Sequence, residues 1–584
     1  PERTPGLAGK SNDAELKNIT REIWGDLDGN TRKERTAGAG KVFWGQPLSS
    51  LLNQLNIKPD FEFSSPNAAI INYIHRKIGD SDVYFVANPF RKQQEVVAAF
   101  RITGKKPELW NPDTGEITPI EVYDRADGRT KVPLQFDPAG SFFIVFRSPV
   151  IKYVKGVEKE GTAIISTKDF PSQQTGKYPD ITNNFTITAW VKPETDENFN
   201  SAFGLGRGLA SNVFYPPEGE RVYGSNHVAC GLIAARNGFI VYERANDSPA
   251  LVLPVPMLVA GWTHVALVYK NGAPFLYVNG KLEKGGTASG KMVHPGLGEA
   301  VQDYFAWYFE GDKSELQLFR EVLTEERIRQ LFHEGAPLPE EPFPVQITAG
   351  VKGELLFWQN GRYTVQSNTG QNKLLPISGI EKPIELRNPW TIHFPPNLGA
   401  PDKISLSKLI SLHRHPEDGV KYFSGTATYT NTFNVPVGLL SSNKRLFLDL
   451  GRVEILADIN VNGKALGILW KPPFRIDITE AVKPGANNLE VQVTNLWPNR
   501  LIGDEQLPAE NEYGNTSGGG VGNVVSGGGI HKLPDWYIEG KPKPAGGRVA
   551  FTTWKHYNKD APLLESGLIG PVLLRTAMVQ TIKY

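Results

Sequence analysis

Short runs in which apolar residues alternate with polar ones, or fill a strand-length stretch, recur along the chain and restrict it to β-sheet folds. Residues 445 to 450 and 456 to 461 are two such runs, and Asn462-Gly463 separates the second from the run that follows it. Asn-Gly is a strong signal for a two-residue hairpin turn, because both residues tolerate positive φ. The run Phe275–Val278 likewise ends in Asn279-Gly280. We therefore predict a mostly β fold, a multidomain array of β-sandwiches and jelly rolls.

The composition agrees with short strands joined by turns, and it excludes several function classes. The 584 residues include 59 Gly and 44 Pro, and a chain of this length holds about three or four domains. The chain contains 63 Lys plus Arg and 62 Asp plus Glu, so it lacks the excess of basic residues that is typical of nucleic-acid-binding proteins. No run reaches the roughly 20 apolar residues that span a bilayer. The lone Cys230 lies in an apolar run, where we expect a buried and inert thiol.

The order of the patterns predicts five segments. Residues 1–71, with a Gly turn feeding a strand at 40–45 and helical spacing at 47–55, form the tail of an α/β domain. Residues 72–150 form the first part of a β-sandwich, 151–343 an inserted module, 344–400 the remaining sandwich strands and a linker, and 401–584 a jelly roll with a Gly-rich loop. Because the first segment is too short to be an α/β domain alone, we interpret the chain as the C-terminal portion of a longer polypeptide.

The inserted module has motifs that occur in a set order. The strand-like segments Phe185–Pro193, Gly261–Tyr269 and Phe275–Lys281 precede Glu315–Arg320 and a short helix that begins near Thr324. This order resembles the laminin-G-like, concanavalin-type jelly roll, which is widespread in extracellular carbohydrate-binding proteins. Since fold alone does not establish function, glycan binding and a spacer role both stay open for the module.

The other segments together resemble one family, the large bacterial α-L-rhamnosidases of glycoside hydrolase family 106. The C-terminal jelly-roll motifs, among them Tyr422–Tyr429, Trp470–Phe474 and Asn495–Asp504, are also similar to those of many large glycosidases. The remaining motifs that carry the resemblance are Gly40–Gly45, His75-Arg76, Asp82–Asn88, Trp390 with Phe394–Pro396, Leu533–Trp536, Phe551–Tyr557 and Ser566–Val572.

The resemblance implies an inverting hydrolase that removes terminal α-L-rhamnose from plant or algal polysaccharides, often with calcium assisting substrate binding. Inversion uses two carboxyl groups roughly 6.5–9.5 Å apart. In the family these lie on an N-terminal (β/α)8 barrel, and the chain shows no eight alternating strand and helix units. The catalytic residues are therefore unknown and expected outside this chain, in an N-terminal portion of the same polypeptide. The family also implies a periplasmic or extracellular location.

A few residues are nevertheless candidates for contact with sugar. Pro472 and Pro473 exclude the segment around Trp470 from a sheet interior, which favours display of that ring. We predict sugar contacts from Trp470, Trp497, Asn499 and Arg500, since aromatic faces stack on sugar rings and amide or guanidinium groups bond to hydroxyls. The alternatives are core tryptophans and a structural ion pair between Arg500 and Asp504.

Other polar groups are candidates for catalysis and metal binding. Asp504, Glu505, Glu510 and Glu512 lie beside the Gly-rich loop of Gly514, Gly518–Gly520 and Gly527–Gly529, the one place where a carboxylate pair is conceivable. His413 and His415 lack a third ligand nearby, which argues against zinc, while the Asp and Asn residues in turns are compatible with calcium. His75-Arg76 could face a substrate, although a structural histidine is the simpler interpretation.

Two other hypotheses compete with the rhamnosidase interpretation. One is a related glycosidase, such as a β-galactosidase or β-glucuronidase, which uses similar jelly rolls for support. The other is a non-catalytic carbohydrate-binding protein. The sequence upstream of this chain would distinguish the rhamnosidase from the related glycosidases. A hydrolysis assay would test whether the protein is a carbohydrate-binding protein without catalysis.

Overall fold

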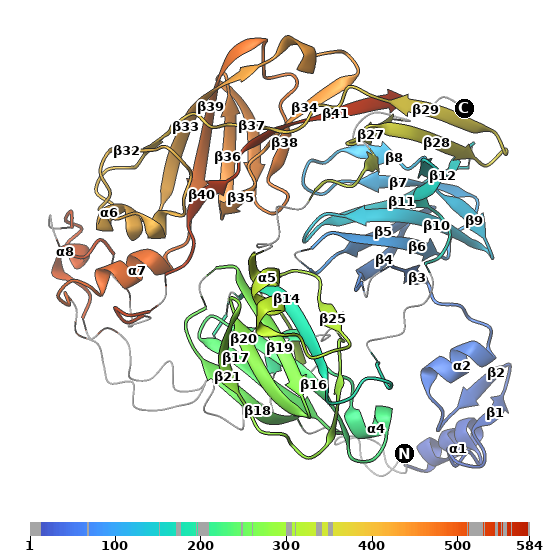
Figure 1. The fold of residues 1–584 in the computed structure, drawn as a ribbon. Coiled ribbons are helices and arrows are strands. Elements are labelled where there is room, and N and C mark those ends of the chain that lie inside the picture. The colour runs from blue at the N-terminus through green and yellow to red at the C-terminus, as the bar shows by residue number, and fades with distance from the viewer. Residues whose placement is uncertain are drawn as a thin grey trace. The chain divides into compact units, whose positions relative to one another are not determined.

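The computed structural model describes most of the chain. The described residues are 13–66, 69–90, 92–150, 152–170, 177–193, 195–196, 209–246, 249–259, 261–298, 306–309, 311–333, 341–347, 354–510, 512, 530, 532–543, 547–550, 552, 557–561 and 563–581. They form many sheets and few helices (Figure 1), which confirms the predicted mostly β class. The chain divides into two compact units, the first made of Pro1–Glu62, Ala99–Thr103 and Arg125–Thr130, and the second of the remaining residues.

The first unit contains two helices and a hairpin. Its elements are α1 (Asp13–Trp24), β1 (Glu34–Ala37), β2 (Gly40–Phe43) and α2 (Leu48–Gln54), and β1 pairs with β2 in antiparallel register. The predicted strand after the Gly turn and the predicted helix are confirmed. Gly45 has φ +75°, and a Cβ there would collide with the backbone of Gly29, so this position requires glycine.

Two sheets contain the strands of residues 72–150 together with β3, which lies before the predicted start of this segment at residue 72. One has the order β4-β5-β11-β7-β8 and the other β3-β6-β10-β9. Their strands are β3 (Phe61–Ser64), β4 (Asn72–Ile78), β5 (Ser81–Ala87), β6 (Gln94–Phe100), β7 (Lys105–Trp110), β8 (Ile117–Pro119), β9 (Asp124–Ala126), β10 (Arg129–Phe136) and β11 (Ser141–Pro149). Alternate residues of β5 are buried, including Tyr84 and Val86, as the period of two requires.

A separate four-stranded sheet joins the segments before and after the inserted module. It has the order β13-β12-β28-β29, and its strands are β12 (Val154–Lys159), β13 (Thr162–Ser166), β28 (Gly361–Ser367) and β29 (Asn372–Ile377). Val157 of β12 lies opposite Val365 of β28, so strands from before and after the inserted module pair in one sheet. An insertion is tolerated where its two ends lie close together.

This pairing corrects one prediction about the strands after the module. Glu354–Trp358 and Tyr363–Val365 were expected to complete the sandwich of residues 72–150. Instead β28 pairs with β12 and β29, while β27 (Glu354–Phe357) pairs with β41 (Leu573–Thr581) near the end of the chain. The apolar pattern identifies a strand, but its partner is set by packing between distant segments, which a single sequence does not reveal.

The inserted module is a two-sheet jelly roll. One sheet has the order β21-β20-β19-β14-β24, with β25 also pairing with β14, and the other has the order β18-β17-β16-β15-β23, with β22 also pairing with β16. The elements are β14 (Phe185–Pro193), β15 (Leu209–Phe214), α4 (Gly219–Tyr223), β16 (His227–Ala235), β17 (Gly238–Arg244), β18 (Pro249–Pro256), β19 (Thr263–Lys270), β20 (Ala273–Val278), β21 (Lys281–Gly285), β22 (Met292–Pro295), β23 (Ala306–Tyr308), β24 (Gly311–Lys313), β25 (Gln317–Phe319) and α5 (Glu325–His333). The predicted strands and the short helix near Thr324 are confirmed.

The C-terminal jelly roll also consists of two main sheets. One has the order β32-β31-β33-β39-β36-β37, the other the order β26-β27-β41-β34-β38 with β30 pairing with β41, and β35 pairs with β40. The strands not yet given are β26 (Val345–Ile347), β30 (Ile384–Glu385), β31 (Trp390–His393), β32 (Lys403–Leu406), β33 (Thr426–Val435), β34 (Lys444–Asp449), β35 (Arg452–Glu454), β36 (Leu456–Val461), β37 (Lys464–Leu469), β38 (Arg475–Asp477), β39 (Gly485–Thr494) and β40 (Gly567–Gly570). Short helices are α6 (Asp418–Lys421), α7 (Pro498–Asp504), α8 (Asp535–Ile538) and the 3-10 turns Leu412–Arg414 and Val437–Leu439.

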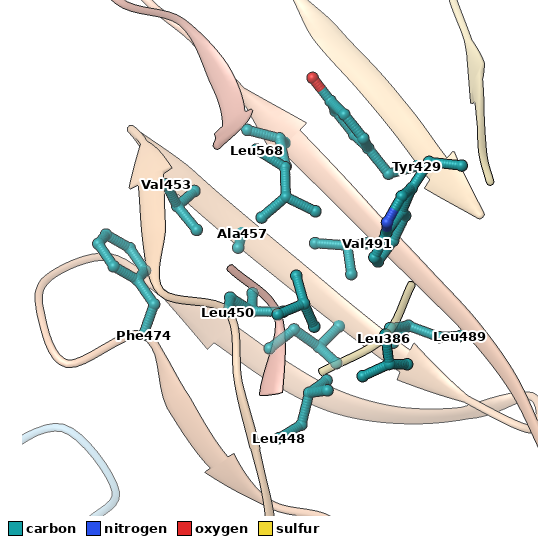
Figure 2. Close-up of a cluster of buried hydrophobic side chains, with 14 of the residues drawn as sticks. Leu386, Tyr429, Leu448, Leu450, Val453, Ala457, Phe474, Leu489, Val491 and Leu568 are labelled. Atoms are coloured by element: carbon teal, nitrogen blue, oxygen red, sulfur yellow. The ribbon is translucent and has the colours of Figure 1, made fainter. Parts of the chain in front are cut away.

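Local sequence explains the hairpins and the core of this jelly roll. Asn462 and Gly463 have φ of 54° and 83° between β36 and β37, so the predicted Asn-Gly turn is confirmed. Figure 2 shows Leu450, Val453 and Leu568 directed toward the same interior as Ala457 and Val491 of the six-stranded sheet. Burying each such leucine contributes about 1.5–3 kcal/mol relative to exposure.

Candidate carbohydrate-binding site

Trp470 lies directly after β37, the edge strand of the six-stranded sheet. It is 54% exposed, which confirms the predicted display of this residue in a loop. The Lys471 ammonium lies 4.8 Å from the centroid of the Trp470 ring and pairs with Asp113 Oδ2 at 2.6 Å. A cation over an indole face is attracted by the ring quadrupole, so the Lys471–Asp113 pair supports one orientation of the ring.

Trp497 is the second exposed tryptophan of this region. It is 58% exposed at the N-terminus of α7, and the neighbouring Leu496 is exposed as well. Pro498 at the first helical position favours the start of a helix there. Both tryptophans are therefore accessible to a ligand, and their contact with sugar stays a prediction.

The structure gives Asn499 and Arg500 a different role from the predicted one. Asn499 is 2% exposed, and its side-chain amide both donates to the Leu564 carbonyl and accepts from the Leu564 N–H, each at 2.7 Å. Arg500 is 5% exposed, and its Nη2 lies 3.0 Å from Asp504 Oδ1. These groups are turned into the protein, because helix periodicity places them on the inner face of α7.

Asp504 completes a structural ion pair. It is buried and accepts hydrogen bonds from the backbone N–H of Val549 at 3.0 Å and of Ala550 at 2.8 Å. The alternative interpretation of Arg500 and Asp504 as a structural pair is thereby confirmed. The pair anchors the segment 547–550 to α7, and both carboxylate oxygens of Asp504 are held in these structural contacts.

Glu505 and Glu510 are engaged by one buried arginine. Arg548 Nη1 lies 2.6 Å from Glu505 Oε1, and the Arg548 backbone N–H donates to Glu510 Oε1 at 2.7 Å. Burial raises the pKa of Glu510, but hydrogen bonds from Lys543 and from the Arg548 backbone outweigh burial and leave that pKa lowered. A general acid needs a raised pKa, so Glu510 is poorly suited to that role.

The rest of the region considered for a carboxylate pair is described only in part. Glu512 is exposed, whereas Gly514, Gly518–Gly520 and Gly527–Gly529 lie outside the described residues. Most of the motif Phe551–Tyr557 lies outside them too. Leu533–Trp536 is described and leads into α8, where the Lys543 ammonium lies 5.7 Å from the Trp536 ring centroid.

His75, His413 and His415 have local structural partners. His413 Nδ1 lies 2.6 Å from Ser411 Oγ, and His415 Nδ1 accepts from the Glu417 N–H at 3.2 Å. His75 stacks on Tyr84 with ring centroids 3.9 Å apart and lies 3.3 Å from Asp82 Oδ1. Among the described residues, no group of three or more His, Cys, Asp or Glu could hold a metal ion.

Cys230 is fully buried in the core of the inserted module. Burial raises the pKa of its thiol, which disfavours the reactive thiolate. The expected burial of this thiol is confirmed, and its inertness stays a prediction. Within the part of the chain that the structure describes, no helix is long and apolar enough to cross a membrane.

Sequence reasoning missed a charged cluster that joins the module to the C-terminal jelly roll. Lys192 Nζ of β14 lies 3.3 Å from Glu454 Oε1, 3.2 Å from Glu565 Oε2 and 3.5 Å from Asp312 Oδ2. Arg452 Nη2 pairs with the same Glu565 oxygen. Lys192 and Glu454 are 262 residues apart, so no local pattern could have indicated their contact.

Comparisons with known proteins match three parts of the chain to protein families. Residues 1–125 match the family model described as alpha-L-rhamnosidase. Residues 169–329 match the concanavalin A-like lectin/glucanases superfamily, and residues 412–526 match the glycosyl hydrolase 2 galactose-binding domain-like family.

Individual relatives extend over different shares of the chain. A putative beta-glucuronidase of Formosa agariphila is 30% identical over 602 aligned residues, which cover 100% of this chain and 48% of the relative. The chain thus spans about half the length of the curated relative it matches. A rhamnosidase structure from Novosphingobium sp. PP1Y aligns with 97% of this chain and 30% of its own at 21% identity and TM-score 0.46. A beta-glucuronidase of an uncultured Clostridium sp. aligns with 21% of this chain and 24% of its own at 25% identity and TM-score 0.18.

The family matches agree with the order of domains in the fold. The concanavalin A-like match covers the two-sheet inserted module, and the galactose-binding-like match lies in the C-terminal jelly roll. The recognition made from the sequence is confirmed: residues 1–125 match the α-L-rhamnosidase family model, and a concanavalin A-like match lies between them and the glycosyl hydrolase 2 galactose-binding domain-like match of residues 412–526.

Proposed function

We propose that the chain is the supporting C-terminal part of an inverting glycoside hydrolase that removes terminal α-L-rhamnose from complex polysaccharides. The observation that carries the proposal is the match of residues 1–125 to the α-L-rhamnosidase family model. In this proposal the two catalytic carboxyl groups, roughly 6.5–9.5 Å apart, belong to a portion of the polypeptide outside these 584 residues.

The ion pairs of the carboxylates beside α7 favour a structural role for this part of the chain. Asp504 is buried against Arg500, and Glu505 and Glu510 are bound by Arg548. Two carboxylates that act as acid and base need an open site between them for a sugar and a water molecule. Three acids held in structural ion pairs do not offer such a site.

The surface of the first unit supports the existence of a further packed portion. Large apolar side chains are exposed there, a pattern that is typical of a surface covered by another protein segment. These residues are Ile19, Ile23, Trp24, Trp44 and Leu48. We propose that an N-terminal portion of the same polypeptide packs against them and that the active site lies in that portion.

Calcium and location complete the proposal. The family resemblance implies calcium; the described residues include no group of three or more His, Cys, Asp or Glu that could hold a metal ion, and no step of the proposal uses calcium. The polysaccharide substrate implies a periplasmic or extracellular protein.

A second candidate follows from the curated relative. Because the Formosa agariphila protein is named a putative beta-glucuronidase, a glucuronide is the alternative substrate. The third candidate is a carbohydrate-binding protein without hydrolytic activity, which the exposed Trp470 and Trp497 would equally serve.

One experiment separates these candidates. Release of the aryl group from an aryl α-L-rhamnoside and from an aryl β-glucuronide is measured for this chain and for a polypeptide extended upstream. Rhamnoside hydrolysis by the extended form alone supports the proposal, and glucuronide hydrolysis supports the second candidate. Hydrolysis by the 584-residue chain that Glu505→Gln or Glu510→Gln abolishes would place catalysis in this chain and overturn the proposal.

A further inference from the structure

Two histidines of the inserted module are in direct contact beside α4. His227 begins β16, and His294 lies in the neighbouring parallel strand β22, where it stands opposite Ala229. His227 Nδ1 lies 2.6 Å from His294 Nε2, and the two rings stack with centroids 4.9 Å apart. His294 is 1% exposed, whereas His227 is half-buried. The contact therefore joins a buried titratable group to one that solvent reaches.

Two tyrosines hold the His294 ring in place. The ring of Tyr223, the last residue of α4, stacks on it with centroids 3.9 Å apart. His294 Nδ1 lies 3.0 Å from the carbonyl oxygen of Tyr178, and the Tyr178 N–H donates to the Tyr223 hydroxyl at 3.2 Å. Helix α4 packs so closely on β16 that a Cβ on Gly219 would collide with the carbonyl oxygen of His227. The two histidines and two tyrosines thus form a histidine clasp, which ties α4, β16 and β22 to the segment that precedes β14.

The hydrogen bonds of the histidine clasp determine where its protons lie. A carbonyl oxygen only accepts, so His294 carries a proton on Nδ1, which donates to Tyr178. In neutral His294 the Nε2 atom is then an acceptor, and His227 donates to it from Nδ1. A first proton can enter at His227 Nε2 without breaking this bond. A second proton has to enter at His294 Nε2, where it would face the His227 N–H, so the doubly charged clasp cannot keep the bond.

Every carboxylate on the described elements that pack against the clasp already has a partner. Glu243 of β17 lies opposite Cys230, on the side that faces the core, and accepts from the Tyr269 hydroxyl at 3.2 Å. The others form ion pairs, Glu218 with Arg221 and Arg244, Glu220 with Lys291, and Asp180 with Arg320, and the exposed Lys177 adds a further cation. A second proton on the clasp would therefore add a positive charge that no neighbouring carboxylate is free to balance.

The environment of His294 determines the pH range in which this happens. Burial lowers the pKa of His294, the hydrogen bond to the Tyr178 carbonyl raises it, and the nearby His227 lowers it, so that it lies below its ordinary value of 6.5. A histidine with a depressed folded-state pKa stabilises the fold above its unfolded pKa and loses that contribution as the pH falls. The contribution of His294 is thus complete above pH 6.5 and decreases below it.

We propose that the histidine clasp is an acid-sensitive switch, which releases α4 and the segment around Tyr178 from β16 and β22 when both histidines are charged. The core of the module lies on the other face of the sheet and keeps its packing, so the change is local. The switch concerns the inserted module alone and does not depend on the proposed hydrolase function. Because the open form binds one more proton than the closed form, the open fraction rises at most about tenfold per pH unit.

Hydrogen exchange of the full chain, measured by mass spectrometry between about pH 7.5 and about pH 5 and corrected for the intrinsic chemical rate, tests the switch. We expect exchange in residues 178–181, α4 and β22 to accelerate by up to about tenfold between about pH 6 and about pH 5. Strands β19 and β20 of the other sheet should show no such acceleration. Glu565 does not interfere, because its pKa lies below 4.5.

A matched pair of variants separates proton uptake by the clasp from general acid destabilisation. His227→Gln removes one titrating ring, and an amide can donate to neutral His294 or accept from its protonated form, so the acceleration should be largely lost. His333→Gln makes the same change at an exposed histidine of α5 in the same module and should keep the native response. Circular dichroism at neutral pH checks that both variants are folded.

Three results would overturn the switch. The first is a native chain whose corrected exchange in α4 and β22 does not change with pH, and this result is decisive even if His227→Gln does not fold. The second is an equal acceleration in His227→Gln and in the native chain. The third is a response that a chelator abolishes, since it would identify loss of a bound metal, and not repulsion between two protonated rings, as the cause.

Discussion

Replacing Lys192 with methionine should loosen the attachment of the inserted module to the C-terminal jelly roll. In the native chain two cations, Lys192 and Arg452, face the three carboxylates of Asp312, Glu454 and Glu565. Lys192 is only 10% exposed in its side chain, so its ammonium interacts in a partly dehydrated environment. Methionine keeps much of the side-chain volume and removes the charge, which leaves three carboxylates with one cation.

The expected cost follows from this geometry. Removing one partner of a buried ion pair costs about 3–5 kcal/mol, because the remaining charge is left uncompensated. Arg452 still pairs with Glu565, and Asp312 is about one-third exposed, so we expect the lower end of this range or less, about 2–3 kcal/mol. We expect this cost to lower the free energy of separating the module from the jelly roll and to leave the stability of the module's own core unchanged.

Hydrogen exchange measured by mass spectrometry resolves such a local opening in a multidomain chain, where a single unfolding free energy is not defined. We expect faster exchange in β14, β24 and β35 of Lys192→Met. Lys291→Met is the control, since Lys291 is more exposed and lies 3.8 Å from Glu220. The double variant Lys192→Met, Glu565→Gln should recover part of the protection, because it removes the uncompensated carboxylate. Exchange in Lys192→Met that matches the Lys291→Met control would refute the reasoning.

Four further outcomes are expected. Burial raises the pKa of Glu565, but Lys192 and Arg452 lower it more, so the folded-state pKa of Glu565 is depressed. The stabilisation from this carboxylate is therefore complete above its ordinary pKa of 4.5 and is lost as the pH falls below that value. Hydrogen exchange of β14 measured as a function of pH would reveal this loss. Asp449→Asn should speed hydrogen exchange in β34, β38 and β41, with a local cost of about 3 kcal/mol, because Asp449 accepts from both Arg475 and Arg575. The exposed Asp169→Asn serves as control, and equal exchange of these strands in the two variants would contradict this. Gly45→Ala should destabilise the first unit far more than Gly38→Ala, whose Cβ would meet nothing within 4 Å, and circular dichroism with hydrogen exchange can compare the two. Cys230 should react with a thiol reagent only on unfolding, and rapid labelling of the native chain would show that the thiol is accessible.

Turns, single strands and short helices were predictable where residues close together in the sequence determine them. The Asn-Gly turns after β20 and β36, the strand Phe185–Pro193 and the helix near Thr324 all follow from periodicity and turn chemistry between neighbouring residues. The display of Trp470 followed from the prolines that come after it, because proline cannot donate to a sheet.

The roles of Asn499, Arg500 and Lys192 could be decided only by tertiary structure. Residue type suggested sugar contact for Asn499 and Arg500, but packing of α7 turns both inward, toward Leu564 and Asp504. Partners of Lys192 lie 120 and 262 residues away, and β27 pairs with a strand more than 200 residues downstream. By itself the sequence determined the β class and the position of individual turns, because these depend on short-range backbone preferences and alternation. Which strands pair, which charges meet and which faces reach solvent depend on long-range packing, and only the folded chain brings those distant groups together.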